Sequence, residues 1–169
     1  RRADLAAITP DRVILVELKS EKDTLTRLEA QMKCFLAYGH KAIAVLHDKF
    51  FDQTPHNDGC KRYVAPELCC SPKIWAYPTP PMGCLTEAWY RWDIPVTGLK
   101  QPPPRLLLEL LFIGEQQAIL RRHKLPTKGN MGKRIDLLAY HLTGQQLTRE
   151  TCRELRAREV LKGSHKILG

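Results

Sequence analysis

The sequence predicts an α/β protein in which a mixed β-sheet core is followed by a small α-helical module. Two observations predict the core: short apolar, β-branched runs of strand length, and one segment among them whose apolar residues recur every three or four positions. The third observation is that helix-like segments follow a cluster of prolines. We therefore predict a core over residues 1–101, a proline-rich linker over 102–105 and a helical module over 106–169.

The predicted core begins with a β-hairpin, because RADLAAI and VILVELKS flank the turn residues TPDR. A helix is predicted from Asp23 to about Gly39, with Ser20 or Asp23 as its N-cap. KAIAVLHD then has the short apolar run of a buried strand, and KIWAYP is a candidate for one further strand. Because the strand pattern starts with the first residues, we also expect a helix upstream of Arg1.

The last third of the chain contains three predicted helices. The three consecutive prolines at 102–104 cannot continue a helix and favour a semi-rigid extended spacer. The predicted helices cover residues 106–123, about 133–142, and 149–161 with Thr148 as the N-cap.

The charge of the chain is strongly positive and unevenly distributed. The 27 lysines and arginines exceed the 18 acidic residues, which gives a net charge of +9. Residues 1–99 hold 13 basic and 12 acidic side chains, whereas residues 100–169 hold 14 basic and 6 acidic ones. A surplus of this size favours a polyanionic partner such as DNA over a neutral metabolite, and it favours the second half as the part that contacts phosphates.

The six cysteines and the absence of long apolar runs indicate a cytoplasmic protein with reduced thiols and no membrane segment. Four cysteines, at 60, 69, 70 and 84, leave a structural zinc site open as an alternative, although they show no CxxC spacing. The aromatic residues between 75 and 92 suit either base stacking or core packing.

The candidate catalytic residues lie in the hairpin. Glu17 and Lys19 are two positions apart on one predicted strand, so they share a face, while Leu18 is expected to point into the core. The turn brings Asp4 across the pair from Glu17. Two carboxylates and an ammonium group would then converge, an arrangement that suits Mg²⁺ or Mn²⁺ and phosphodiester hydrolysis. The alternative is that residues 17–23 are only a solvated charge run.

These residues carry a family resemblance. RADLAAI…VELKSEKDTLTRLEAQ resembles the PD-(D/E)xK, or restriction-endonuclease-like, nucleases over about residues 1–50, although alanine precedes Asp4 where the motif has proline. The resemblance implies a restriction-endonuclease-like core and a metal held by Asp4, Glu17 and the Leu18 carbonyl. It assigns Lys19 to orienting water or stabilising charge. It also implies a catalytic role for Gln31, which matches the helical glutamine of the RecB-like and virus-type repair branches.

The expected function is therefore metal-dependent DNA cleavage in phage or bacterial replication, recombination, repair or restriction. The alternative is a non-catalytic DNA-binding protein that retains the nuclease fold, and a homodimer is compatible with either.

A second resemblance lies in the helical module. AILRRHKLPTKGNMGKRIDLLAYHL resembles the SAP DNA-binding motif, whose hallmark is a leucine-proline-x-x-glycine turn, here residues 125–129. Lys124 stands where that family commonly has glycine. Basic side chains around this turn and along the last helix are predicted to contact DNA, or alternatively to form a solvated surface: Lys124, Lys128, Lys133, Arg134, Arg149, Arg153 and Arg156.

Overall fold

The computed structural model describes residues 3–51, 73–77 and 99–158. The chain divides into two compact units, residues 1–7 with 13–102 and residues 8–12 with 103–169, and each unit is described by itself. The division between residues 102 and 103 falls inside the predicted linker. Pro104 is already the first residue of a helix, so the prolines begin the helical unit as well as ending the first one.

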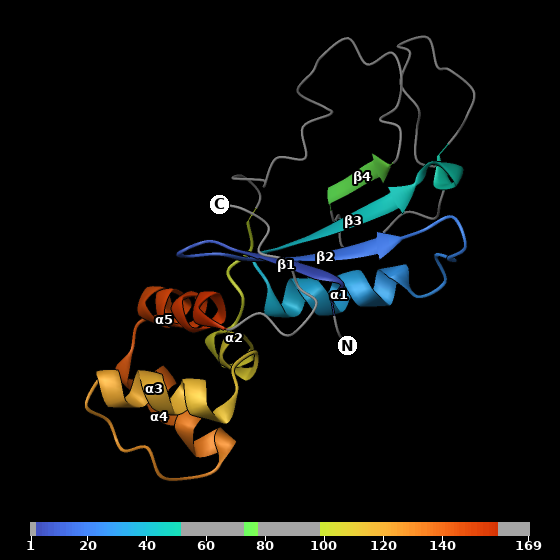
Figure 1. The fold of residues 1–169 in the computed structure, drawn as a ribbon. Coiled ribbons are helices and arrows are strands. Elements are labelled where there is room, and N and C mark those ends of the chain that lie inside the picture. Colours follow the sequence, from blue (N-terminus) through green and yellow to red (C-terminus); the bar gives the residue numbers. More distant parts are fainter. Residues whose placement is uncertain (1–2, 52–72, 78–98, 159–169) are drawn as a thin grey trace. The chain divides into compact units, whose positions relative to one another are not determined.

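The first unit is built on a four-stranded sheet with the order β1-β2-β3-β4 (Figure 1). Strands β1 and β2 form the predicted hairpin, in which the Thr9 amide donates to the Arg12 carbonyl at 3.0 Å. Strands β2, β3 and β4 are parallel. The mixed sheet confirms the predicted α/β class, and its strands are β1 (Leu5–Ile8), β2 (Val13–Lys19), β3 (Lys41–His47) and β4 (Lys73–Tyr77).

Helix α1 (Leu28–Tyr38) connects β2 to β3 and packs beside β2 (Figure 1). Its apolar residues Leu28, Met32 and Phe35 are buried. The helix ends tightly against the sheet at Gly39, where a Cβ atom would lie 3.1 Å from the Val13 carbonyl oxygen. A larger residue there would push the helix away from β2.

The predicted start of this helix at Asp23 is wrong, because α1 begins at Leu28. The Asp23 carboxylate instead accepts hydrogen bonds from the Ser20 hydroxyl at 2.6 Å and from the Ser20 amide at 2.7 Å. These bonds lower the pKa of Asp23 below its usual value. Both residues predicted as N-caps are thus used to form a turn between β2 and α1.

The two faces of β2 have different neighbours. Ile14 and Val16 lie in an apolar cluster with Ile43 and Val45 of β3. Since side chains alternate along a strand, Glu17 belongs to the opposite face, which α1 covers. The expectation that Leu18 is a core residue is wrong: it is 39% exposed, because on its face the buried cluster ends at Val16 in this strand.

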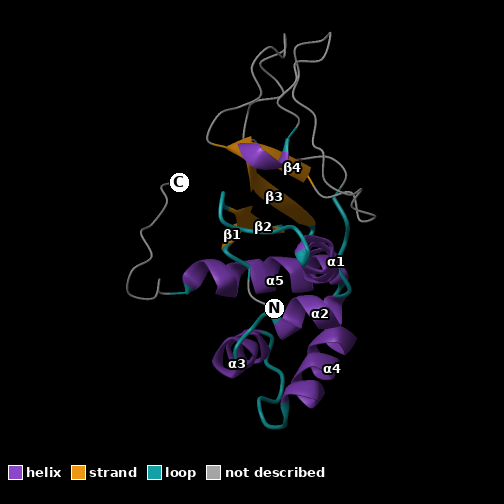
Figure 2. Ribbon diagram, turned by 90° about the vertical axis from the view of Figure 1, so that its right-hand side faces the viewer, coloured by secondary structure: helices purple, strands orange, loops and turns teal. Residues whose placement is uncertain are grey.

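In the part of the chain that the structure describes, the helical unit contains four helices (Figure 2). They are α2 (Pro104–Glu109), α3 (Ile113–Arg122), α4 (Met131–His141) and α5 (Gly144–Ala157). Residues of all four share one apolar core. The single helix predicted over residues 106–123 is wrong, because the chain turns between α2 and α3. The turn is held by side-chain contacts, since the Gln116 side-chain amide donates to the Leu108 carbonyl at 3.3 Å and the Arg158 guanidinium donates to the Leu110 carbonyl at 2.7 Å.

The helix predicted near residues 133–142 corresponds to α4, but the predicted start of the last helix is wrong. Helix α5 begins at Gly144 with Thr143 as its N-cap, and the Gln146 side chain accepts from the Thr143 amide at 2.8 Å. Thr148 lies inside the helix, where its hydroxyl donates to the Gly144 carbonyl at 2.9 Å. The observed N-cap therefore lies five residues before the predicted one.

Several sequence features lie outside the described residues, including the four cysteines of the zinc alternative and the aromatic residues 89, 90 and 92. Cys152 is described and lies in the core of the helical unit, where burial raises the pKa of its thiol to about 11. No helix in the described part of the chain has both the length and the apolar character needed to cross a lipid bilayer.

Candidate functional site

The predicted catalytic residues gather at one edge of the sheet. Because β2, β3 and β4 are parallel, their carboxyl ends meet at the same edge, and Lys19, His47 and Tyr77 are the last residues of these strands. Asp4 directly precedes β1, which runs antiparallel to β2, so it lies at this edge as well. The carboxyl edge of parallel strands is where ligands bind in open α/β sheets.

Glu17 is the centre of the site. It is only 4% exposed, and its Oε1 atom accepts a hydrogen bond from the Lys19 ammonium at 2.6 Å. The Gln31 side-chain amide, presented by the first turn of α1, donates to the same oxygen. Strand alternation explains the Lys19 contact, whereas packing of α1 on the sheet is needed to bring Gln31 to it. The structure thus joins three of the predicted catalytic residues.

Asp4 reaches the same strand at the next residue. Its carboxylate is exposed, and Oδ2 accepts a hydrogen bond from the Leu18 amide at 2.8 Å. The amide and carbonyl of one residue in a strand point to the same side, so the Leu18 carbonyl faces the side of Asp4. Asp4 is therefore brought to the Leu18 peptide, directly beside Glu17 in the chain.

Two buried oxygens in this site are unsatisfied. Neither Glu17 Oε2 nor Gln31 Oε1 has a hydrogen-bond partner among the residues that the structure describes. A buried acceptor left in this state costs about 1–3 kcal/mol, so the site favours an additional donor or cation.

The oxygens of this site fit a divalent metal of the magnesium type. The available ligands are the Asp4 and Glu17 carboxylates and the Leu18 carbonyl, all hard oxygen donors of the kind that Mg²⁺ prefers. Within the described ranges, no group of three or more His, Cys, Asp and Glu side chains is placed to hold a metal. A metal here would thus need the backbone carbonyl as well as the two carboxylates.

The sequence gives no local signal for two further contacts at this edge. The Tyr77 hydroxyl donates to the Lys19 carbonyl at 3.3 Å, and the Lys49 ammonium donates to the Asp23 carbonyl at 2.8 Å. Tyr77 stands 58 positions after Lys19 in the chain. Tyr77 and Lys19 lie close together only because of the order in which the strands pair in the sheet.

In the helical unit, every acidic side chain described between residues 103 and 158 is engaged in an ion pair. Three arginines provide the guanidinium partners, and His123 lies 3.0 Å from one of the same carboxylates. The pairs are Arg105 with Glu109 and Asp136, Arg122 with Glu150 and Glu154, and Arg158 with Glu115. The acidic groups therefore neutralise one set of basic residues and leave another set uncompensated.

The uncompensated set contains six of the seven residues predicted to contact DNA. Each is exposed, and none has an ion-pair partner in the part of the chain that the structure describes: Lys124, Lys128, Lys133, Arg149, Arg153 and Arg156. The prediction for Arg134 is corrected, because this side chain is 4% exposed. Its guanidinium donates to Gln116 Oε1 at 3.1 Å and to the Gly129 carbonyl, so it holds the turn between α3 and α4.

Lys124 adopts a left-handed backbone conformation, with φ of 56°. The Leu125 amide donates to the Leu120 carbonyl at 2.8 Å and the Lys124 amide donates to the Arg121 carbonyl at 3.0 Å, which is the Schellman pattern that ends a helix. This geometry favours glycine, which has no Cβ atom to clash in the left-handed region.

We expect Lys124→Gly to raise the free energy of unfolding by about 1 kcal/mol, because glycine avoids the steric cost of the left-handed region. Urea unfolding of the whole chain measures this. Lys128→Gly is the matched control, since Lys124 is the one non-glycine residue with positive φ in the described ranges. The control should be neutral or destabilising, and an equal gain for both variants would contradict the steric explanation.

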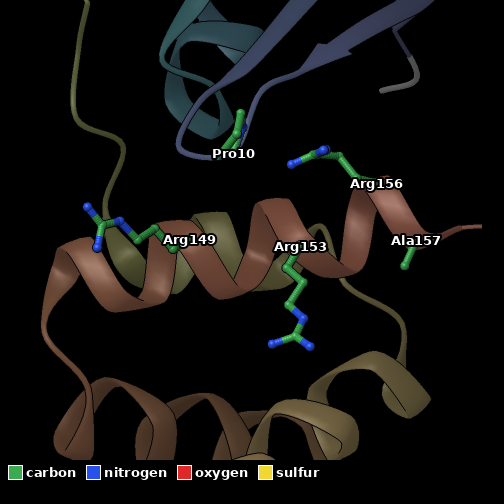
Figure 3. Close-up of a pocket in the computed structure, with 5 residues that line it drawn as sticks. All are labelled: Pro10, Arg149, Arg153, Arg156 and Ala157. Atoms are coloured by element: carbon green, nitrogen blue, oxygen red, sulfur yellow. The ribbon is translucent and has the colours of Figure 1, made fainter. Parts of the chain in front are cut away.

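The α5 arginines line an open hollow of about 460 Å³ together with Pro10 and Ala157 (Figure 3). Arg156 extends towards the side of α5 on which Pro10 lies, whereas Arg153 points to the opposite side of the helix (Figure 3). The hollow is thus lined by three cationic side chains of one helix.

One comparison with known proteins gives a match. A family model described as "Bacteriophage P4 protein cII" matches residues 1–56, a stretch that contains Asp4, Glu17, Lys19 and Gln31 but ends before β4. No curated protein and no solved structure matches the chain significantly.

Proposed function

We propose that the chain is a divalent-metal-dependent DNA nuclease. The observation that carries this proposal is the Glu17 carboxylate, which is buried at the carboxyl edge of the sheet. One of its oxygens accepts hydrogen bonds from Lys19 and Gln31, and the other has no hydrogen-bond partner among the described residues. Burying a carboxylate is costly unless its oxygens are paired. A buried carboxylate with one unpaired oxygen therefore suits a ligand that contacts this oxygen.

Asp4, Glu17 and the Leu18 carbonyl would hold the metal, Mg²⁺ or Mn²⁺. The bound metal would polarise a phosphate oxygen and lower the pKa of a water molecule. Lys19 contributes a positive charge beside the site, which stabilises the negative charge that develops on the phosphate during hydrolysis. Gln31 fixes the orientation of Glu17 through its side-chain nitrogen, and its buried Oε1 atom, which has no hydrogen-bond partner among the described residues, would accept from a water molecule that entered the site.

The helical unit supplies the proposed DNA contacts. Its six uncompensated cations lie in the turn between α3 and α4, in the first turn of α4 and along α5. Such groups raise the affinity for DNA, because each phosphate contact releases condensed counterions. Contacts of this kind hold DNA without reading its sequence.

We expect Arg153→Gln to reduce the slope of log affinity against log salt by roughly 0.9, and the triple variant with Arg149→Gln and Arg156→Gln to reduce it by roughly 2–3. Fluorescence anisotropy with labelled duplex DNA at several salt concentrations measures the slope. Arg105→Gln is the matched control, because its guanidinium is ion-paired with Asp136 at 2.9 Å. The same loss of slope in control and test variants would show that net charge, and not this surface, determines binding.

A non-catalytic DNA-binding protein with this fold is the second candidate. This candidate is favoured by two contacts to Glu17 Oε1: the Lys19 ammonium neutralises the charge of the carboxylate, and the Gln31 side-chain amide donates a hydrogen bond to the same oxygen. Cleavage of a panel of labelled duplex, flap, junction and single-stranded DNAs in Mg²⁺, Mn²⁺ or EDTA separates the two candidates. Metal-dependent products support the nuclease, and binding without cleavage of any substrate in either metal supports the alternative. The match to a bacteriophage family model supports a phage origin for either candidate.

A further inference from the structure

We propose that Tyr77 is a positioning residue for Lys19, and that it acts through the backbone of β2. This inference rests on the proposed nuclease function, because it concerns the geometry of the same site. It assigns a role to β4, which follows Glu17 and Lys19 by more than fifty residues. This strand lies outside the stretch that matches the phage family model.

The contact crosses the sheet. Strand β3 lies between β2 and β4, yet the Tyr77 side chain reaches the Lys19 carbonyl, to which its hydroxyl donates at 3.3 Å. Lys19 is the last residue of β2, and the chain turns away from the sheet after it. The hydroxyl therefore holds the strand at the point where regular pairing ends.

The Tyr77 ring is itself held in place. His47, its pairing partner on β3, packs against it edge to face with the ring centroids 5.6 Å apart. His47 Nδ1 accepts from the Lys49 amide at 3.2 Å, and the Lys49 ammonium donates to the Asp23 carbonyl in the segment that follows Lys19. The end of β2 is thus connected to the ends of both other parallel strands, β3 beside it and β4 beyond β3.

A fixed backbone at Lys19 matters for the proposed chemistry. The ammonium must remain on Glu17 Oε1, 2.6 Å away, while the other carboxylate oxygen is left for the ligand. Small displacements of a catalytic group lower the rate strongly, and loss of a supporting contact typically costs 10–100-fold. Tyr77 touches the Lys19 backbone in the structure and not its ammonium, which is why its role is positioning.

The test is Tyr77→Phe in the full chain, which removes the hydroxyl and keeps the ring beside His47. We expect DNA cleavage in Mg²⁺ to fall by roughly tenfold or more in kcat with little change in KM. Limited acetylation read by peptide mass spectrometry gives a second readout without metal or DNA. Lys19 is 7% exposed, and we expect its modification to rise several-fold in the variant. Tyr140→Phe is the control, since Tyr140 is 84% exposed in the helical unit.

Slower cleavage together with greater acetylation of Lys19 supports the inference. Unchanged acetylation overturns it, even if cleavage falls, because Tyr77 would then act on the substrate directly. Greater acetylation with unchanged cleavage also overturns it, since Lys19 would be freed without catalytic consequence. If the wild-type chain cleaves none of the DNAs in Mg²⁺ or Mn²⁺, the nuclease proposal fails, and acetylation alone then decides whether Tyr77 holds Lys19.

Discussion

Asp4→Asn should lower metal-dependent DNA cleavage by a factor on the order of 10³ while leaving the stability of the chain nearly unchanged. Asparagine keeps an oxygen that can accept the hydrogen bond from the Leu18 amide, so the local structure should survive. It removes the negative charge, and a neutral amide is a poorer ligand for a hard cation. Initial cleavage rates at saturating DNA and a range of Mg²⁺ concentrations measure the loss, and calorimetric titration measures the weakened metal binding.

The matched control for this change is Asp11→Asn in the hairpin turn. Asp11 is also an exposed aspartate, and it accepts a hydrogen bond from the Thr9 hydroxyl at 3.1 Å, which asparagine can also accept. The control should cleave DNA like the wild type. Cleavage at the wild-type rate by Asp4→Asn would remove Asp4 from the site and with it the proposed ligand set.

The second large effect concerns the buried pair of Glu17 and Lys19, whose side chains are 5% and 9% exposed. Glu17→Gln or Lys19→Met alone should lower the free energy of unfolding by about 3–5 kcal/mol, because each leaves a buried charge without its partner. The double variant should recover most of this loss. All three variants should lose cleavage, since none retains both the carboxylate and the ammonium. Urea unfolding provides the stabilities for the double-mutant cycle.

Lys22 provides a control for the role of Lys19 in cleavage. It follows Lys19 by three residues but is exposed in the turn between β2 and α1. Lys19→Ala should lose most of the cleavage activity, whereas Lys22→Ala should retain it. Equal losses would indicate that total positive charge near the site matters more than the contact with Glu17.

The strands could be predicted because their signals are local. The turn residues of the hairpin, the apolar runs of β3 and β4 and the alternation in β2 are all properties of a few neighbouring residues. The same alternation predicted that Glu17 and Lys19 share a face. Helix ends were predicted less well, because Ser20, Asp23 and Thr148 each had another hydrogen-bond partner available.

The amino-acid pattern thus establishes the α/β class, the hairpin and the pairing of Glu17 with Lys19, all of which depend on short-range geometry. Tertiary structure decides the rest of the site: packing of α1 brings Gln31 to Glu17, and the parallel order of the strands brings Tyr77 to the Lys19 carbonyl. It also decides which cations are free, because Arg134 is buried beneath a turn while Arg153 remains exposed. Charge can be counted along a chain, but burial and pairing depend on residues that only folding brings together.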